Sequence, residues 1–365
     1  MAGSSYGTIF TITTWGESHG EAIGVTVDGC PAGLTLDTSD IQKQLDYRKP
    51  GQSKFTTQRQ ESDQVEILSG TFEGKTTGTP ISLIVRNTNQ ISKHYGNISE
   101  VYRPGHADYT FQEKYGIRDY RGGGRSSGRE TIGRVAAGAI ALKLLEELGI
   151  EVMAYTKAIG PISIPSEAYD YSEIMNNKLY MPNADYANQA SEYLANCMQQ
   201  QDSSGGIIEC LVQNMPVGVG QTVFEKLDAN LAKGLMSIGA VKGVEIGDGF
   251  QAATANGSYN NDAFYINDGN IEKATNHSGG TLGGMSDGST IITRVAVKPT
   301  PSISSLQHAV TTNKEDIDIN IHGRHDPIIV PRAVVVVKSM VALTIIDAVL
   351  INMSSRLDKV KDFYN

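Results

Sequence analysis

Residues 121–130 combine glycine and arginine in a pattern suited to binding an anion. They read RGGGRSSGRE and run directly into an apolar periodicity typical of a helix. Glycine lets a backbone approach a ligand closely, the first turn of a helix presents unpaired N–H groups, and arginine adds fork-shaped donors. The segment matches neither the Walker A nor the GxGxxG pattern, so it indicates no particular nucleotide. We predict an anion site here; the alternative is a flexible loop before an ordinary helix.

Three histidines lie in glycine-flanked loops that also carry an acidic residue. They are His19 in GESHG, His106 in PGHAD and His325 in GRHDP. Histidine titrates near neutral pH and can pass protons to a substrate positioned against it, although each alone could be an ordinary surface residue. With Glu17 or Asp326 the three could instead ligate a metal, but no HExxH or other dedicated spacing supports that reading.

Further cations and glycines stand in loops. Four cations fall within the twelve positions 48–59, and six arginines lie between residues 103 and 134. Such clusters are either solvated cationic faces or parts of a ligand site. Residues 276–284 read NHSGGTLGG, which suits close packing beside a flat ring, and 298–302 read KPTPS, a turn with one cation and hydroxyl donors.

The composition limits the possible partners. Across 365 residues, 31 Lys and Arg stand against 40 Asp and Glu, a net charge of −9, which argues against nucleic acid or an anionic membrane as the main partner. Three cysteines without a CxxC pair favour a reducing cytoplasm over a disulfide framework. The most apolar stretch, 328–353, is interrupted by Arg332, Lys338 and Asp347, so we expect core rather than a membrane span.

Two-residue alternation predicts strands along the whole chain. Residues 9–14 and 23–27 are expected to form a hairpin whose loop, 16–20, carries His19. Further strands are expected at 65–67, 81–85 and 291–297, and the β-branched run 333–337 is expected to be a strand covered on both faces.

Apolar residues at helical spacing predict helices at 129–148, 223–238 and 338–353. The first should begin at a capping box of Ser127 and Glu130 and end before Gly149. Because strands and long helices intermix without a regular βαβ repeat, the fold class is α+β. No repeat or linker interrupts the chain, which predicts a single large domain over residues 1–365.

Taken in order along the chain, these segments resemble the chorismate synthase family. The similarity rests on GESHG at 16–20, RPGHAD at 103–108, RGGGRSSGRE at 121–130, VKGVEIG at 241–247 and GRHDP at 323–327. It implies a shikimate-pathway lyase that converts 5-enolpyruvylshikimate 3-phosphate to chorismate and phosphate, using reduced FMN without net redox change. It also implies a homotetramer whose subunit is a β-α-β sandwich, with helices between antiparallel sheets.

The resemblance also implies roles for individual residues. His19, His106 and Asp326 match the family's acid/base residues. FMN would be held by Arg125, Ser126, Ser127, Gly239, Ala240, Gly283, Lys298, Pro299, Thr300, Pro301, Ser302 and Arg324. Substrate or NADP would be bound by Arg48, Lys54, Arg129 and Arg134. Gly128, Pro301 and Lys54 stand where alanine, serine and arginine are common in the family.

The implied substrate accounts for the arginines. It carries about four negative charges, and each ion pair near 4 Å contributes up to ~4 kcal/mol at an effective dielectric of about 20, before desolvation is subtracted. We expect His19 to deliver a proton to the departing phosphate, His106 to stabilise anionic reduced flavin, and Asp326, beside Arg324, to assist proton removal at flavin N5. No long insertion is left unaccounted for, so NADPH is expected to act indirectly, through an external flavin reductase.

Two other functions fit part of the pattern. A metal-dependent hydrolase of a phosphorylated metabolite would use the histidines as ligands, and a non-catalytic binder of such a metabolite would use only the arginines. Resistance to chelators would argue against the first. A yellow flavin complex formed only with substrate would argue against the second. The number and order of the matching segments favour the lyase.

Overall fold

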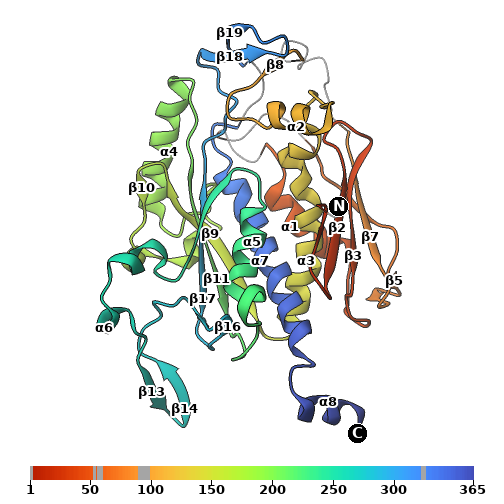
Figure 1. Cartoon of the computed structure of the whole chain (residues 1–365), viewed down its shortest axis with the longest axis vertical. Coiled ribbons are helices and arrows are strands. Elements are labelled where there is room, and N and C mark those ends of the chain that lie inside the picture. Colours follow the sequence, from red (N-terminus) through yellow and green to blue (C-terminus); the bar gives the residue numbers. More distant parts are fainter. Residues whose placement is uncertain (1–2, 52–54, 56–60, 89–98, 322–325) are drawn as a thin grey trace.

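Two five-stranded antiparallel sheets enclose a layer of helices (Figure 1). The computed structural model describes residues 3–51, 55, 61–88, 99–321 and 326–365. The first sheet runs, in spatial order, through β1 (Ser5–Tyr6), β2 (Thr11–Gly16), β3 (Ala22–Asp28), β7 (Ile81–Arg86) and β4 (Val65–Ile67). The second runs through β10 (Ile162–Ser163), β9 (Glu151–Ile159), β11 (Gly206–Gln213), β17 (Ile291–Val297) and β12 (Val241–Ile246). The α+β class and the β-α-β sandwich are thereby confirmed.

Four helices fill the space between the sheets: α1 (Thr38–Arg48), α3 (Thr131–Glu147), α5 (Leu227–Met236) and α7 (Val330–Asn352). α3 packs against β2 and β3, whereas α7 packs against β9 and β11. The two helices approach closely because α3 has Gly138 opposite Ser339; a Cβ on Gly138 would lie 2.3 Å from the Ser339 Cβ. One buried cluster therefore spans both sheets, the arrangement expected of the predicted single domain.

The prediction of a strand at 333–337 is wrong. These residues lie in the first turns of α7, which carries Pro331 at its start. β-branched residues cost less than about 1 kcal/mol each in a helix, and the burial of Val334 to Val337 outweighs that cost. By length and composition α7 could cross a membrane, but 67% of its most apolar window is buried inside the protein. The stretch 328–346 is therefore mostly core, as expected, whereas its end is only partly buried and Met353 is exposed.

The other predicted elements are found with shifted boundaries. The hairpin of β2 and β3 and the strands at 65–67, 81–85 and 291–297 are confirmed. The helix predicted at 223–238 begins only at Leu227, because Val223 has a φ of 59° and Lys226 an extended ψ of 144°. Gly149, with a φ of 71°, follows the end of α3 as predicted.

The predicted capping box is wrong in one half. Ser127 does accept a hydrogen bond from a backbone N–H, that of Arg129, but it caps a short 3₁₀ turn before α3. The Glu130 carboxylate accepts hydrogen bonds from Thr14 and Arg134. The tertiary partner Thr14 and the i+4 neighbour Arg134 thus replace the backbone partner of a capping box.

The remaining elements surround the sandwich. α2 (Asp108–Tyr115) lies at the top of Figure 1, near the small sheet of β8 (Val101–Tyr102), β18 (Gln307–Thr311) and β19 (Asp316–Ile319). α4 (Ala184–Gln199) packs beside β10. Hairpins are formed by β5 (Thr71–Phe72) with β6 (Lys75–Thr76), β13 (Phe264–Asn267) with β14 (Asn270–Lys273), and β15 (Thr281–Leu282) with β16 (Met285–Ser286). Two short helices, α6 (Gly257–Asn260) and α8 (Leu357–Tyr364), complete the chain.

Candidate active site

The loop between β2 and β3 holds His19 in a fixed, mostly buried position. The side chain of Asn87, which follows β7, donates hydrogen bonds to the carbonyl oxygens of Glu17 (3.0 Å) and Gly20 (2.9 Å). The Ser18 hydroxyl lies 3.1 Å from His19 Nδ1 and donates to the Gly122 carbonyl oxygen at 3.3 Å. The loop is therefore tied both to the first sheet and to the glycine-rich segment.

Two consecutive glycines of that segment bring His19 and His106 to one turn. Gly122 and Gly123 have φ angles of 68° and 83°, which favour glycine. A Cβ on Gly122 would lie 2.3 Å from His19 Cε1, and a Cβ on Gly123 would lie 3.2 Å from His106 Cε1. Because consecutive Cα atoms are only ~3.8 Å apart, both imidazoles lie against one short turn.

His106 belongs to a turn that also involves Arg103 and Asp108. Asp108 Oδ1 lies 3.0 Å from His106 Nδ1, and Arg103 pairs with both carboxylate oxygens of Asp108 at 2.7 and 2.8 Å. Burial alone would raise the pKa of Asp108, but hydrogen bonds from Arg103 and His106 outweigh it and hold that pKa far below its usual range. Asp108 is thus a carboxylate at neutral pH.

The turn 298–302 lies against the His106 loop. Lys298 Nζ donates to the Gly105 carbonyl oxygen at 2.6 Å, and the Lys298 backbone N–H donates to Ala240 at 2.9 Å. A Cβ on Gly105 would lie 3.1 Å from the Pro301 Cβ. The predicted flavin residues 239–240 and 298–302 are therefore close to His106.

The turn offers an unsatisfied polar group, and Gly239 near it has an uncovered backbone. The Thr300 hydroxyl is buried, and none of the residues that the structure describes forms a hydrogen bond with it. A Cβ on Gly239 would meet no atom within 4 Å. An unsatisfied buried hydroxyl beside an open backbone suits a polar ligand, so these residues fit FMN.

The side chains of Arg125, Ser126 and Ser127 bond within the protein. Arg125 donates to the Thr14 hydroxyl at 2.7 Å and to the Gly16 carbonyl oxygen at 3.3 Å. Ser126 donates to the Gly123 carbonyl oxygen at 2.7 Å. These bonds fasten the glycine-rich segment to β2, on the side where the His19 loop begins.

Arg48 and Arg129, predicted to bind substrate or NADP, share one buried carboxylate. Arg48 is 1% exposed, and its Nη2 lies 2.8 Å from Asp63 Oδ2. Arg129 Nη1 lies 3.0 Å from Asp63 Oδ1, and its Nε donates to the Asn87 side chain at 3.0 Å. The network thus reaches the residue that holds the His19 loop.

Burial and charge oppose each other in this network. Burial lowers the pKa of Arg48 to about 10, partly offset by Asp63, so the guanidinium remains charged at neutral pH. Burial would raise the pKa of Asp63, but the charges of Arg48 and Arg129 outweigh it and lower that pKa. All three groups are therefore ionised inside the protein.

Asp326 and Arg134 join the same region from other elements. Arg332, in the first turn of α7, pairs with Asp326 at 2.8 Å and donates to the Arg48 carbonyl oxygen at 3.1 Å. Arg134 pairs with Glu130 at 2.8 Å and donates to the Ser237 hydroxyl, just before Gly239 and Ala240. Both thus lie within the network around the predicted site.

One described position, Gly283, is not brought to this place. Gly283 lies in the β15–β16 turn, next to Gly284, whose carbonyl oxygen accepts from Leu227 at the start of α5. Ala240 follows the end of α5, a ten-residue helix of about 15 Å, so the two are separated within one chain. Lys54 and Arg324, like His325, lie outside the described residues.

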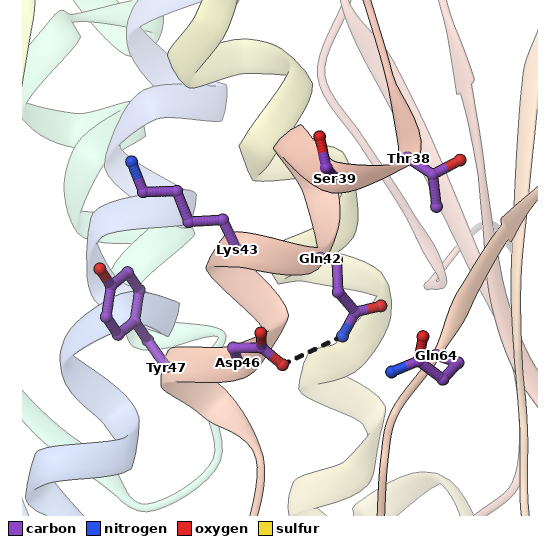
Figure 2. Close-up of a pocket in the computed structure, with 7 residues that line it drawn as sticks. All are labelled: Thr38, Ser39, Gln42, Lys43, Asp46, Tyr47 and Gln64. Carbon is purple, nitrogen blue, oxygen red and sulfur yellow. Dashed lines mark hydrogen bonds between the residues drawn. The ribbon is translucent and has the colours of Figure 1, made fainter.

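A separate hollow runs along α1 and encloses about 630 Å³ (Figure 2). It is lined by Thr38, Ser39, Gln42, Lys43, Asp46, Tyr47 and Gln64, none of which belongs to the predicted site. In the described part of the chain, no three side chains of His, Cys, Asp or Glu gather as a metal ion would require.

Three residues around the site were missed from the sequence: Asn87, Asp63 and Asp108. Each acts through a partner elsewhere in the chain. Asn87 holds the His19 loop, Asp63 pairs with Arg48, and Asp108 contacts His106 around a turn. Only the acidic residue in PGHAD offered a local signal.

Comparisons with a family model, with relatives and with a solved structure all point to one family. The family model for chorismate synthase matches residues 10–350. A chorismate synthase of Agathobacter rectalis is 65% identical over 100% of this chain and 99% of its own, and one of Methanococcoides burtonii is 53% identical over 95% and 96%. A crystal structure of a chorismate synthase, 30% identical, covers 98% of this chain and 97% of its own, with a TM-score of 0.77.

Proposed function

Because the chain belongs to the chorismate synthase family, we propose that the turn at Gly122 and Gly123 is where phosphate leaves the substrate. The enzyme is a carbon–oxygen lyase that converts 5-enolpyruvylshikimate 3-phosphate to chorismate and phosphate by anti-1,4 elimination. Reduced FMN, when bound, would supply the elimination with an electron that returns to it, so the reaction would have no net redox change. The observation that supports the location is the contact of His19 and His106 with two consecutive glycines.

The turn 298–302 is the proposed binding site of FMN. Lys298 supplies a cation, Thr300 a buried hydroxyl in need of a partner, and Gly239 an open backbone. Residues 125–127 would support this binding site indirectly, because their hydrogen bonds hold the glycine-rich turn in place. Gly283 could take part only through a second copy of the chain or a rearrangement, because α5 separates it from Ala240.

The chain's own acid/base groups have distinct proposed tasks. His19, held by Ser18 and backed by Gly122, delivers a proton to the leaving phosphate. His106 would stabilise the anionic reduced flavin when the cofactor is bound. Asp326, oriented by Arg332 at 2.8 Å, accepts a proton at the end of the reaction.

We further propose a homotetramer in the cytoplasm that receives reduced FMN from an external NADPH-dependent flavin reductase. The β13–β14 hairpin exposes Phe264, Ile266 and Ile271, apolar side chains that subunit contacts would cover. The three cysteines are buried and unpaired, which accords with a reducing compartment.

An anaerobic assay with photoreduced FMN and 5-enolpyruvylshikimate 3-phosphate, following the absorbance of chorismate, tests the site. We expect His19→Ala and His106→Ala each to lower turnover about 10²- to 10⁴-fold, the usual contribution of a positioned proton-transfer group. His308→Ala is the matched control, because this histidine is exposed on β18. Near-parental turnover of both site variants would refute the assignment.

A further inference from the structure

The side-chain amide of Asn87 has three hydrogen-bond partners that belong to two separate parts of the site. Its Nδ2 donates to the carbonyl oxygens of Glu17 at 3.0 Å and Gly20 at 2.9 Å, the first and last residues of the turn that contains His19. Its Oδ1 accepts from Arg129 Nε at 3.0 Å. One amide therefore joins the loop of the proposed proton donor to an arginine predicted to bind substrate or NADP.

The chemistry of these partners fixes the orientation of the amide. Carbonyl oxygens only accept hydrogen bonds and a guanidinium only donates them, so Nδ2 must face Glu17 and Gly20 while Oδ1 faces Arg129. A reversed amide would set its oxygen against two carbonyl oxygens and its N–H groups against the guanidinium. The Asn87 backbone N–H also donates to the Glu21 carbonyl oxygen at 3.0 Å. The side chain thus has one orientation that suits all of its partners.

The guanidinium of Arg129 is held through a second nitrogen as well. The side chain is buried, and its Nη1 lies 3.0 Å from Asp63 Oδ1 and 4.0 Å from Glu61 Oε1. A guanidinium can bond to Asp63 and to the amide at once because its nitrogens are separate and rigidly spaced, whereas lysine has a single nitrogen. The Glu61 carboxylate accepts from the hydroxyl of Thr88, the residue after Asn87, at 3.0 Å. The buried charges therefore determine where the amide lies.

We propose that Asn87 is a positioning residue that couples the position of the His19 loop to that of the Arg129 guanidinium. The ring of His19 lies against the glycine turn, where a Cβ on Gly122 would be 2.3 Å from its Cε1. A displacement of about 1 Å in a reacting group can cost about 10²-fold in rate, so the amide bears on proton delivery from a distance. The coupling itself stands on the contacts, and its consequence for turnover rests on the proposed function.

Hydrogen–deuterium exchange of the substrate-free protein, read by mass spectrometry on peptides that cover residues 16–22, tests the coupling without turnover. Asn87→Asp keeps the acceptor but removes both donors, so it should raise exchange in this loop at least about tenfold. Arg129→Lys should raise it at least about threefold in the parental protein, but less than about 1.5-fold in an Asn87→Ala background. Unchanged exchange in Asn87→Asp, or an equal effect of Arg129→Lys in both backgrounds, would overturn the proposal.

Asn177→Ala is the matched control, because the Asn177 amide also donates to two carbonyl oxygens, those of Glu173 and Met181, both at 2.8 Å. It should raise exchange around residues 173–181 and leave residues 16–22 unchanged. Peptides from β11 report general destabilisation, and a rise there as large as in the His19 loop would overturn the proposal. If Asn87→Asp does not fold, Asn87→Ala introduces no charge and takes its place with the same expected result.

Turnover in the anaerobic assay shows whether the coupling serves the reaction. Asn87→Asp should lower kcat about tenfold in the parental enzyme but less than about twofold in a His19→Ala background, as expected for two residues that act as one unit. Equal costs in both backgrounds would show that Asn87 does not act through His19 and would overturn the proposal. If the exchange results are as expected but the parental enzyme has no lyase turnover, the proposed function fails and the coupling stands. If the parental enzyme turns over and a folded Asn87→Asp matches it, the positioning role fails and the function stands.

Discussion

Replacing Asp63 with asparagine should destabilise the protein far more than the loss of an ordinary ion pair. Asp63 is 1% exposed and lies 2.8 Å from Arg48 and 3.0 Å from Arg129. Without its charge, two buried guanidinium groups lose their shared partner. Removal of one member of a buried ion pair typically costs roughly 3–5 kcal/mol, because the remaining charge is left uncompensated. Arg129 keeps Glu61 at 4.0 Å, so the loss falls mainly on Arg48. We expect Asp63→Asn to lower the free energy of unfolding by about that amount.

The measurement is urea denaturation at fixed protein concentration, followed by circular dichroism and by the fluorescence of Trp15, the single tryptophan. Coincidence of the two signals checks for one cooperative transition. Glu66→Gln provides the control, since Glu66 pairs with Arg86 at 3.1 Å on the surface and should cost no more than about 1 kcal/mol.

The dependence on pH has a defined sign. The pKa of Asp63 is lowered in the folded protein, so its stabilisation is fully present above the unfolded value of about 3.9 and is lost as the pH falls through the folded value. The difference in free energy of unfolding between the parental protein and Asp63→Asn should therefore stay constant from pH 8 to about pH 5 and shrink only in stronger acid. A cost below about 1 kcal/mol at pH 7, with native secondary structure retained, would refute the reasoning.

Four further predictions concern the site and the assembly. Gly122→Ala would place a Cβ 2.3 Å from His19 Cε1 and should lower turnover about 10²-fold by displacing the ring about 1 Å. Gly128→Ala, whose Cβ would have nothing within 4 Å, should leave turnover unchanged, and steady-state assays of both variants test this. Asn87→Ala should lower turnover roughly tenfold with the fold retained, because the His19 loop loses two hydrogen bonds; unchanged turnover would count against this. Aerobic incubation of the enzyme with 5-enolpyruvylshikimate 3-phosphate, NADPH and FMN, without a reductase, should yield no chorismate. Chorismate formed under these conditions would contradict an external source of reduced FMN. Light scattering should give about four times the 39.2 kDa chain mass, and a monomer would exclude the tetramer.

The strands could be predicted from the sequence because their signals are local, whereas the anion site at 121–130 stays a prediction. Two-residue alternation indicates β2, β3, β7 and β17 without knowledge of any partner. The glycines and arginines of 121–130 indicate an anion site through the chemistry of neighbouring residues alone. The loops of His19 and His106 were recognisable for the same reason.

The tertiary structure alone decided which side chains meet. Residues 333–337 have strand-like composition, yet burial on all sides of α7 outweighs that preference. Arg48 and Arg129 were predicted to bind substrate or NADP, and the structure shows that both are buried and pair with Asp63. Asn87 holds the His19 loop through contacts that no sequence spacing indicates, whereas Asp108 had a local signal in PGHAD. The reason is physical: the energy of a buried charge depends on partners brought together by folding, whereas helical and strand periodicity depends only on neighbours along the chain.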